Sequence, residues 1–422
     1  LYMQCSKKCE YTHNPQWYKG IEYLKELERG FSYKEDQLVP GWFEVPLKKG
    51  ESIIFAAGIS EVKTNTLKGL WEKELQRRSA RDTMFNSLKN AASQFYKREG
   101  DKCYLLAGYP WFKATAREEF MALPGCTLGI GRPEYWDAIV NQTAVEEVRA
   151  FMEGRPHKLI GMDEPDALLW FIHALQKYAT YTSIQETTKT YGQLIIDIML
   201  FIRRQQHPRL FLHNNGLLWV NGTEQPATWM NAVEDGRPIT PRTGYVVEIN
   251  ALWYNALKFA AELATEQKNE NQADLFDYQA GLSGNSLVAK FWNGTYLYDY
   301  VDGDYCNVEV RPNMLFAVSL PYSALDRKQQ KSVVDIVTRE LLTVKGLRSI
   351  SPKSGMYRPE YIGGELERDR NYHNGPIWPW TTAAFVEAYL KVYKMSGLSF
   401  VMRMMAGFEP EMKELTLGSL SE

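Results

Sequence analysis

Helical periodicity is the feature of this 422-residue sequence that most limits its fold. From about Ser79 onward, apolar residues recur at three-to-four spacing in eleven stretches, which is typical of helices with one buried face. The predicted helices cover residues 80–98, 116–130, 133–152, 164–181, 186–205, 245–267, 271–291, 313–320, 326–341, 376–394 and 399–408. Some connecting loops are short, whereas residues 210–244 and 349–375 are long and rich in Gly, Pro, Asn and Trp. Paired helices with long loops at one end predict a mainly α toroid whose loops build a site.

The first part of the chain has a different pattern. Between Tyr33 and Ile59, short extended pieces alternate with turn signals such as Pro40-Gly41 and Lys49-Gly50. Such a pattern is typical of strands. We therefore expect residues 1–78 to be the tail of an N-terminal β domain with a linker, and residues 79–422 to be a helical domain.

Charge and composition exclude several classes of function. The net charge of -2 leaves no broad basic field, so neither nucleic acid nor a membrane surface is an expected partner. The longest apolar run, residues 194–202, is interrupted by Asp197 and is too short to span a bilayer. Five cysteines form no disulfide framework, and neither they nor the six scattered histidines have metal-site spacing. We expect a cytoplasmic protein without metal or cofactor.

Aromatic residues make up 13% of the chain, and several lie in polar loops. Most are expected in the core, but rigid aromatic rings also stack on the flat faces of sugars. Residues 107–112 read AGYPWF, with Tyr109 and Trp111, and Arg117 and Glu118 follow at the start of a helix. An Arg–carboxylate pair suits neighbouring sugar hydroxyls, although acids at a helix N-terminus are also favourable without any ligand.

Three further segments mix amides, charged groups and tryptophans. Residues 212–232 read LHNNGLLWVNGTEQPATWMNA, include Trp229, and form an irregular stretch of the kind that is usually functional. Glu248 follows in EINALWYN, and is either a site residue or a solvated helix residue. The third segment, NYHNGPIWPW at 371–380, contains His373 and Trp378. His373 is a candidate site residue or a hydrogen-bonded structural histidine.

Taken in order, these segments resemble a known family. AGYPWF, TWMNA, PRTGYVVEINALWYNAL, VEVRPN with Arg311, and YHNGPIWPW are similar to motifs of the C-terminal amylo-α-1,6-glucosidase domain of glycogen debranching enzymes. The resemblance runs from about Leu88 to the end. The segment NPQWYKGIEYLKELERGFSYKEDQLVPGWF resembles the junction with the family's N-terminal domain. The resemblance as a whole implies an (α/α)6 barrel, related to glucoamylase. Such a barrel would hydrolyse with inversion and bind a branched α-glucan such as glycogen or limit dextrin. The resemblance also implies that the barrel's last helix is missing from this chain.

The resemblance assigns roles to individual residues. Gly418 to Glu422 are similar to the motif of the catalytic base, which places the base at Glu422. Where the family has an aspartic acid after TWM, as the general acid, this chain has Asn231, and an amide offers no acidic proton. Glu234 or Asp235 is then the substitute. We expect Glu234, held protonated by burial against aromatic rings, because Asp235 precedes Gly236 and suits a turn. The family's Arg–Asp sugar-binding pair is Arg117-Glu118 here.

Three functions therefore remain open. The first is an inverting α-1,6-glucosidase in which Arg117, Glu118 and Arg311 hold the sugar ring and Trp111, Trp229 and Trp378 stack on it. The second is a glucan-binding protein that has lost its acid, as Asn231 suggests. The third is a related helical-barrel glycosidase with another sugar preference, which fold alone does not distinguish.

Overall fold

The computed structural model describes residues 1–109, 111–414 and 418–420. Its contacts divide the chain into two units, Leu1–Asn90 with Ile362–Glu365, and Ala91–Tyr361 with Leu366–Glu422. This division falls after Asn90, and the domain limits expected near Ser79 stay a prediction. Among the described residues, the helices are all too short or too polar to cross a membrane.

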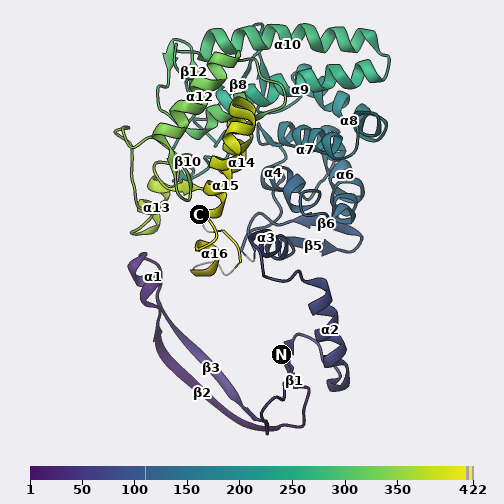
Figure 1. Ribbon diagram of the computed structural model, residues 1–422, viewed down its shortest axis with the longest axis vertical. Coiled ribbons are helices and arrows are strands. Elements are labelled where there is room, and N and C mark those ends of the chain that lie inside the picture. Colours follow the sequence, from purple (N-terminus) through teal and green to yellow (C-terminus); the bar gives the residue numbers. More distant parts are fainter. Residues whose placement is uncertain (110, 415–417, 421–422) are drawn as a thin grey trace. The chain divides into compact units, whose positions relative to one another are not determined.

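The first unit contains the predicted strands. β2 and β3 form a long antiparallel ribbon whose register runs from the pair Glu10 and Glu44 to the pair Glu22 and Lys34 (Figure 1). β1 pairs with β4. Its elements are β1 (Tyr2–Cys5), β2 (Glu10–Glu22), α1 (Leu24–Glu28), β3 (Lys34–Glu44), β4 (Phe55–Gly58), η1 (Thr64–Thr66), α2 (Leu67–Arg77) and α3 (Met84–Ala92), which ends in the second unit.

The second unit is mainly helical, as predicted from the periodicity. Its helical elements are α4 (Ala116–Cys126), α5 (Pro133–Trp136), η2 (Asp137–Ala144), α6 (Val145–Met152), α7 (Ala167–Tyr181), α8 (Ile184–Arg203), α9 (Val247–Glu266), α10 (Glu270–Phe291), η3 (Pro312–Leu315), α11 (Phe316–Ser319), α12 (Arg327–Glu340), α13 (Glu365–Tyr372), α14 (Thr381–Tyr393), η4 (Lys394–Gly397), α15 (Leu398–Ala406) and α16 (Glu411–Glu414). The (α/α)6 arrangement stays a prediction.

Helices that follow one another in the chain pack as hairpins. α9 lies beside α10 (Figure 1) and also contacts α7 and α8, while α14 packs on α11 and α12. The apolar stripe of α9 explains its central place, because Ile249, Leu252 and Trp253 are all buried. These contacts bury one large hydrophobic core. The helices thereby hold the starts of α4, α7 and α9, which carry charged side chains, in fixed places.

Short strands replace part of the expected loops. Their bounds are β5 (Tyr96–Glu99), β6 (Lys102–Leu105), β7 (Phe211–Leu212), β8 (Leu218–Val220), β9 (Val233–Glu234), β10 (Arg237–Pro238), β11 (Gly244–Val246), β12 (Tyr300–Asp302), β13 (Tyr305–Cys306), β14 (Leu342–Thr343), β15 (Gly346–Arg348) and β16 (Ile377–Trp378). A five-stranded sheet, in the order β13-β12-β11-β8-β7, joins the long 210–244 segment to the strand after Asp299. That sheet brings residues far apart in sequence to the start of α9.

Several helix predictions were wrong in detail. Within the predicted helix 376–394, residues 377–378 form β16 and the helix begins only at Thr381. Residues 96–98 lie in β5 because Gly100, with φ of 62°, turns the chain into the β5–β6 hairpin. The stretch 133–152 is divided into α5, the π-helical η2 and α6. Helix 313–320 begins as a 3-10 turn after Pro312.

Candidate active site

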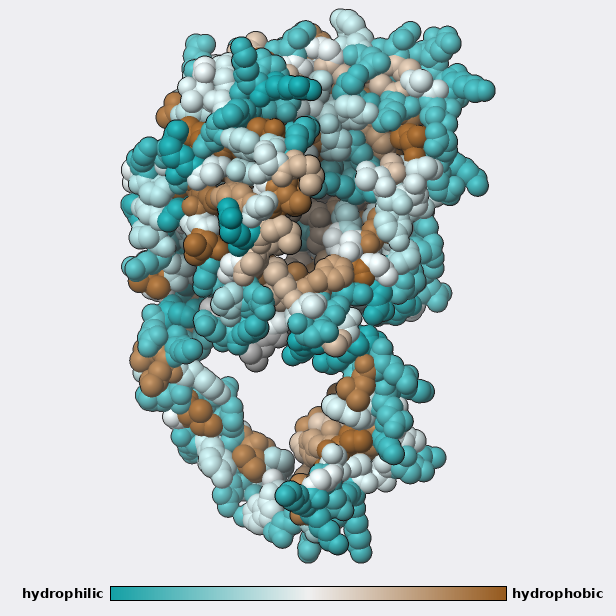
Figure 2. Space-filling view, in the orientation of Figure 1, coloured by the Kyte–Doolittle hydropathy of each residue, from teal (hydrophilic) through white to brown (hydrophobic). Residues whose placement is uncertain are grey.

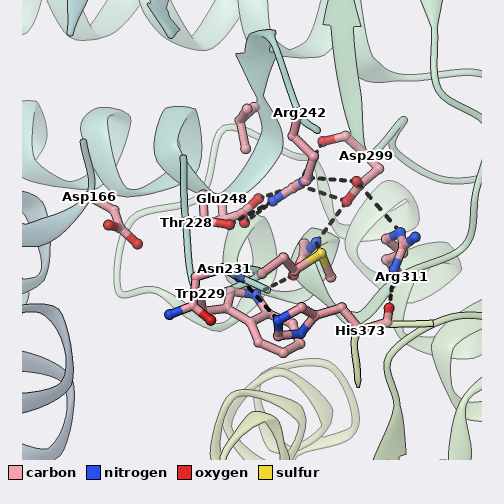
Figure 3. Close-up of polar contacts among 12 residues, drawn as sticks. Asp166, Thr228, Trp229, Asn231, Arg242, Glu248, Asp299, Arg311 and His373 are labelled. Carbon is pink, nitrogen blue, oxygen red and sulfur yellow. Dashed lines mark hydrogen bonds and ion pairs between the residues drawn. The ribbon is translucent and has the colours of Figure 1, made fainter. Parts of the chain in front are cut away.

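The segment from Thr228 to Asn231 lies at the centre of the candidate site (Figure 3). Thr228, Trp229 and Met230 are buried, and Asn231 is exposed. Thr228 Oγ1 accepts a hydrogen bond from Arg242 Nη1 at 3.0 Å, and Trp229 Nε1 donates to Asn313 Oδ1 at 2.9 Å. Contacts from distant parts of the chain therefore fix the backbone that presents Asn231.

A buried charge cluster supports this segment. The guanidinium of Arg242 donates to both oxygens of Glu248 and to both carboxylate oxygens of Asp299. Burial acts to lower the pKa of Arg242, but the charges of Asp299 and Glu248 outweigh it, and the pKa is raised. Asp299 Oδ1 also accepts from Asn313 Nδ2 at 2.8 Å. The cluster thus connects α9, β12 and the turn at Asn313 to the Trp229 segment.

Glu248 is a member of this cluster and not a solvated helix residue. It lies in the first turn of α9 with 1% of its surface exposed. Burial raises the pKa of its carboxyl, against the opposing effect of Arg242. Both oxygens of Glu248 are used by Arg242, so the contact with substrate expected from the sequence stays a prediction.

Arg311 is likewise occupied by protein acceptors. Its Nη1 donates to the carbonyl oxygens of His373 at 2.6 Å and Ser349 at 3.2 Å, and its Nη2 donates to Asn374 Oδ1 at 2.9 Å. Burial lowers the pKa of its guanidinium. These contacts hold the loop before β16, and a direct contact of Arg311 with a sugar stays a prediction.

His373 connects that loop to Asn231. Its Nε2 accepts from the backbone N–H of Asn231 at 3.1 Å and of Ala232 at 3.3 Å. The ring proton therefore lies on Nδ1, which is buried and has no hydrogen-bond partner among the described residues. Burial, helped by Arg311 and Arg242, lowers the pKa of His373 to about 3. The neutral ring is thus an acceptor that holds the Asn231 backbone.

Aromatic rings enclose the same segment. Trp229 and Trp378 pack with ring centres 5.0 Å apart, and Trp380 lies 5.1 Å from Trp229. Trp378 also stacks on His373 at 5.1 Å. Trp229, His373 and Trp378, three of the expected site residues, therefore lie together.

Arg117 begins a second charged cluster, at the start of α4. Its side chain is buried, with 1% exposed, and its Nε donates to both oxygens of Asp166 at 2.8 and 2.9 Å. Glu164 Oε2 lies 2.9 Å from Arg117 Nη1, and Glu118 lies 4.0 Å from the same nitrogen. Trp170 Nε1 donates to Asp166, and its ring lies 6.5 Å from Trp380. A chain of aromatic rings therefore leads from the Arg117 cluster to Trp229.

Other expected site residues lie outside these contacts. Trp111 is 83% exposed and Tyr109 is 54% exposed. Glu118 accepts from Thr115 Oγ1 and is partly exposed. Their roles in binding stay predictions. The proposed base, Glu422, lies outside the described residues.

The expected environment of Glu234 was wrong. Glu234 is partly exposed and accepts hydrogen bonds from Arg370 Nε at 3.0 Å and from Arg370 Nη2 at 2.5 Å. The hydrogen bonds from Arg370 lower the pKa of its carboxyl, so burial does not hold it protonated. Glu234 and Arg370 line an open depression of about 690 Å³. Asp235 has φ of 51°, which fits the turn that its following glycine suggested.

Several residues of the two clusters were missed from the sequence. Asp299 stands between two tyrosines, and its neighbours Asp302 and Asp304 are also acidic, so the local sequence does not single it out. Asp166 directly precedes α7, but its carboxylate pairs with Arg117 and makes no capping hydrogen bond to the helix. The acidic run from Asp163 to Asp166, next to a predicted buried helix face, was the available signal for both Glu164 and Asp166.

Comparison with known proteins shows the family of the chain. The family model described as Amylo-alpha-1,6-glucosidase matches residues 89–422, and the model described as Glycogen debranching enzyme N terminal matches residues 1–54. The match covers most of the chain and defines a protein of the glycosidase class. More narrowly, the chain belongs to the amylo-alpha-1,6-glucosidase family, as its motifs predicted.

Individual relatives are more distant. A glycogen debranching enzyme of Saccharomyces cerevisiae is 26% identical over 219 residues, which cover 42% of this chain and 14% of the yeast protein. The chain therefore spans only a small part of that relative. A solved structure described as a sialidase is similar in fold, with a TM-score of 0.53 and 13% identity over 78% of this chain and 30% of that chain.

Proposed function

We propose that this chain is the glucosidase part of a debranching enzyme, which removes α-1,6-linked glucose from branch stubs of glycogen or limit dextrin with inversion. The observation that carries the proposal is the convergence of family motifs on one segment. Arg242, Asn313 and His373, from three distant parts of the sequence, all bind residues 228–232. A few convergent polar groups beside aromatic side chains are the usual features of a ligand site. We also propose a reducing, cytoplasmic location, which the free cysteines of the described chain support.

Inversion requires two carboxyl groups. One protonates the oxygen of the departing glucan, and the other removes a proton from the water that attacks the opposite face of the ring. We propose Glu422 as the base, from its motif. Glu422→Gln is expected to abolish glucose release while sparing glucan binding, because Gln removes the base but keeps the shape. Unchanged turnover would exclude Glu422 from the mechanism.

The position of the acid in the family's motif holds Asn231 in this chain. The exposed side chain at Asn231 is an amide, which has no acidic proton to donate. The Arg370 pair keeps the Glu234 carboxyl ionised, so Glu234 must first separate from Arg370 to act. We therefore propose slow hydrolysis with Glu234 as the acid, because Asp235 lies in a turn.

Glucose release from a glucosyl-branched limit dextrin by the full-length protein tests the proposal. Asn231→Asp is expected to raise the rate by about 100-fold, because general acid catalysis contributes at least that factor. Glu234→Gln separates the alternatives. A 100-fold loss in that variant, with no gain from Asn231→Asp, would identify Glu234 as the acid.

A second candidate is a glucan-binding protein without hydrolysis. The amide at Asn231 and the ionised Glu234 favour it, because together they leave the leaving oxygen without a proton donor. Binding of limit dextrin by the full-length protein, with no glucose released over hours, would establish this candidate and exclude the glucosidase.

A further inference from the structure

The guanidinium of Arg117 is buried, and the described residues use only its Nε–H as a hydrogen-bond donor. Nε binds Asp166, while neither Nη1 nor Nη2 has a hydrogen-bond acceptor among the described residues. Glu164 Oε2 lies 2.9 Å from Nη1, yet the N–H groups of Arg117 do not point at it. Buried charged donors without acceptors are costly, so an unfilled set of this kind indicates a ligand.

Glu164 is the matching acceptor. Its Oε2 is buried and has no hydrogen-bond donor among the described residues, although 27% of the side chain remains exposed. Burial raises the pKa of its carboxyl to about 7, against the opposing charge of Arg117. Glu118 differs, because its carboxylate already accepts from Thr115.

The surrounding charges select the kind of ligand. Four carboxylates, of Glu118, Asp163, Glu164 and Asp166, surround the two positive charges of Arg117 and Arg209. An anion is therefore disfavoured, and neutral hydroxyl groups are favoured, since each hydroxyl can accept from Arg117 and donate to a carboxylate. A hollow bordered by apolar side chains opens on the surface of the second unit (Figure 2). Trp170 Nε1 donates to Asp166 at 3.2 Å and so helps to fix that carboxylate beside Arg117.

We propose that Arg117 and Glu164 together form a subsite for two neighbouring hydroxyls of a neutral sugar, with Glu164, and not Glu118, as the carboxylate that accepts. One hydroxyl oxygen accepts from a terminal nitrogen of Arg117, and a hydroxyl proton is donated to Glu164. This inference rests on the proposed function for the identity of the sugar, a glucosyl unit. It makes Glu164 a determinant of specificity for that unit.

Calorimetric titration of the full-length protein with an isomaltose analogue, in which sulfur replaces the bridging oxygen, tests the subsite. The analogue is neutral and resists hydrolysis, so binding is measured apart from turnover. Glu164→Gln is expected to weaken binding about tenfold, and Glu164→Leu about a hundredfold, as for loss of hydrogen bonds to a charged group. Glu153→Gln is the matched control, because Glu153 pairs with Arg155 on the surface. It should bind like the wild type.

The outcomes separate this inference from the proposed function. Equal affinity of the wild type and both Glu164 variants, each shown to be folded by its thermal unfolding, would overturn the subsite. So would a loss of binding in Glu118→Gln that exceeds the loss in Glu164→Gln. A wild type that does not bind the analogue would overturn both proposals. A wild type that binds through Glu164 but never releases glucose would leave the subsite intact and exclude the glucosidase.

Discussion

Two buried arginines in the second unit are placed in different surroundings. Arg242 has carboxylates on both sides, and its Nε, Nη1 and Nη2 all donate to protein acceptors. Arg117 has carboxylates nearby, but its two terminal nitrogens have no acceptor in the described chain. A charge cluster whose hydrogen-bonding groups are all paired stabilises the fold and positions its neighbours. A cluster with unpaired donors can still bind a ligand. The comparison therefore divides the candidate site into a supporting part and a binding part.

The largest expected effect comes from breaking the satisfied cluster. Asp299→Ala removes the carboxylate that pairs with Arg242 and leaves a buried charge without half of its partners. We expect the free energy of unfolding to fall by about 3–5 kcal/mol, the usual cost of breaking a buried ion pair. Thermal unfolding measures this as a fall in Tm of about 10 °C. A Tm within 2 °C of the wild type would show that the cluster does not support the fold.

The same substitution in the two clusters sharpens the comparison. Glu248→Gln disrupts the two hydrogen bonds from Arg242 and should cost about 2–3 kcal/mol, as for hydrogen bonds to a charged group. Glu164→Gln removes no hydrogen bond among the described residues. It removes the ion pair with Arg117 but also a carboxylate whose burial is costly, so the free energy of unfolding should change by about 1 kcal/mol or less. Urea unfolding of the two variants measures the difference. Equal losses would contradict the division into a supporting and a binding part.

Glu119 extends the comparison to a buried carboxyl without an arginine partner. Its Oε2 accepts from the backbone N–H of Leu105 at 2.9 Å, and burial raises its pKa to about 8. Because the folded protein holds a proton that the unfolded chain releases above about pH 4.5, the wild type loses stability as the pH rises from there toward 8.

Glu119→Gln removes this titration. The free energy of unfolding of the variant, relative to that of the wild type, should rise by about 1–2 kcal/mol from pH 5 to pH 8. This is within the limit of about 1.4 kcal/mol per unit of pKa shift. Urea unfolding at the two pH values measures the gain. A difference between variant and wild type that is the same at both values would refute the raised pKa.

The sequence predicted the helices and several residues of the site, and it did so where the signal is local. Trp229, His373 and Trp378 stand in loops whose mixed composition marks them, and the structure brings them together. Periodicity identified α7 to α10 because each has a long apolar stripe.

The rest depended on partners that are distant in sequence. Asp299 pairs with Arg242, which lies 57 positions away, and the residues around Asp299 do not predict that partner. Glu234 was expected to be protonated because the sequence places it near aromatic residues. Its partner, Arg370, lies 136 positions away and keeps the carboxyl ionised. Glu164 was overlooked because the packing of α4 on α7, which no local pattern reveals, brings Arg117 beside it. Burial and charge pairing are thus set by tertiary packing and not by the local sequence.

A crystal structure of the full-length protein with the sulfur-bridged isomaltose analogue tests the central claim most directly. If Arg117 binds substrate and Arg242 only supports the fold, sugar hydroxyls should lie within about 3 Å of Arg117 Nη1 or Nη2 and of a Glu164 oxygen. Arg242 should also keep its contacts to Glu248 and Asp299 without touching the sugar. A sugar bound elsewhere, with the terminal nitrogens of Arg117 donating to protein acceptors instead, would contradict the claim.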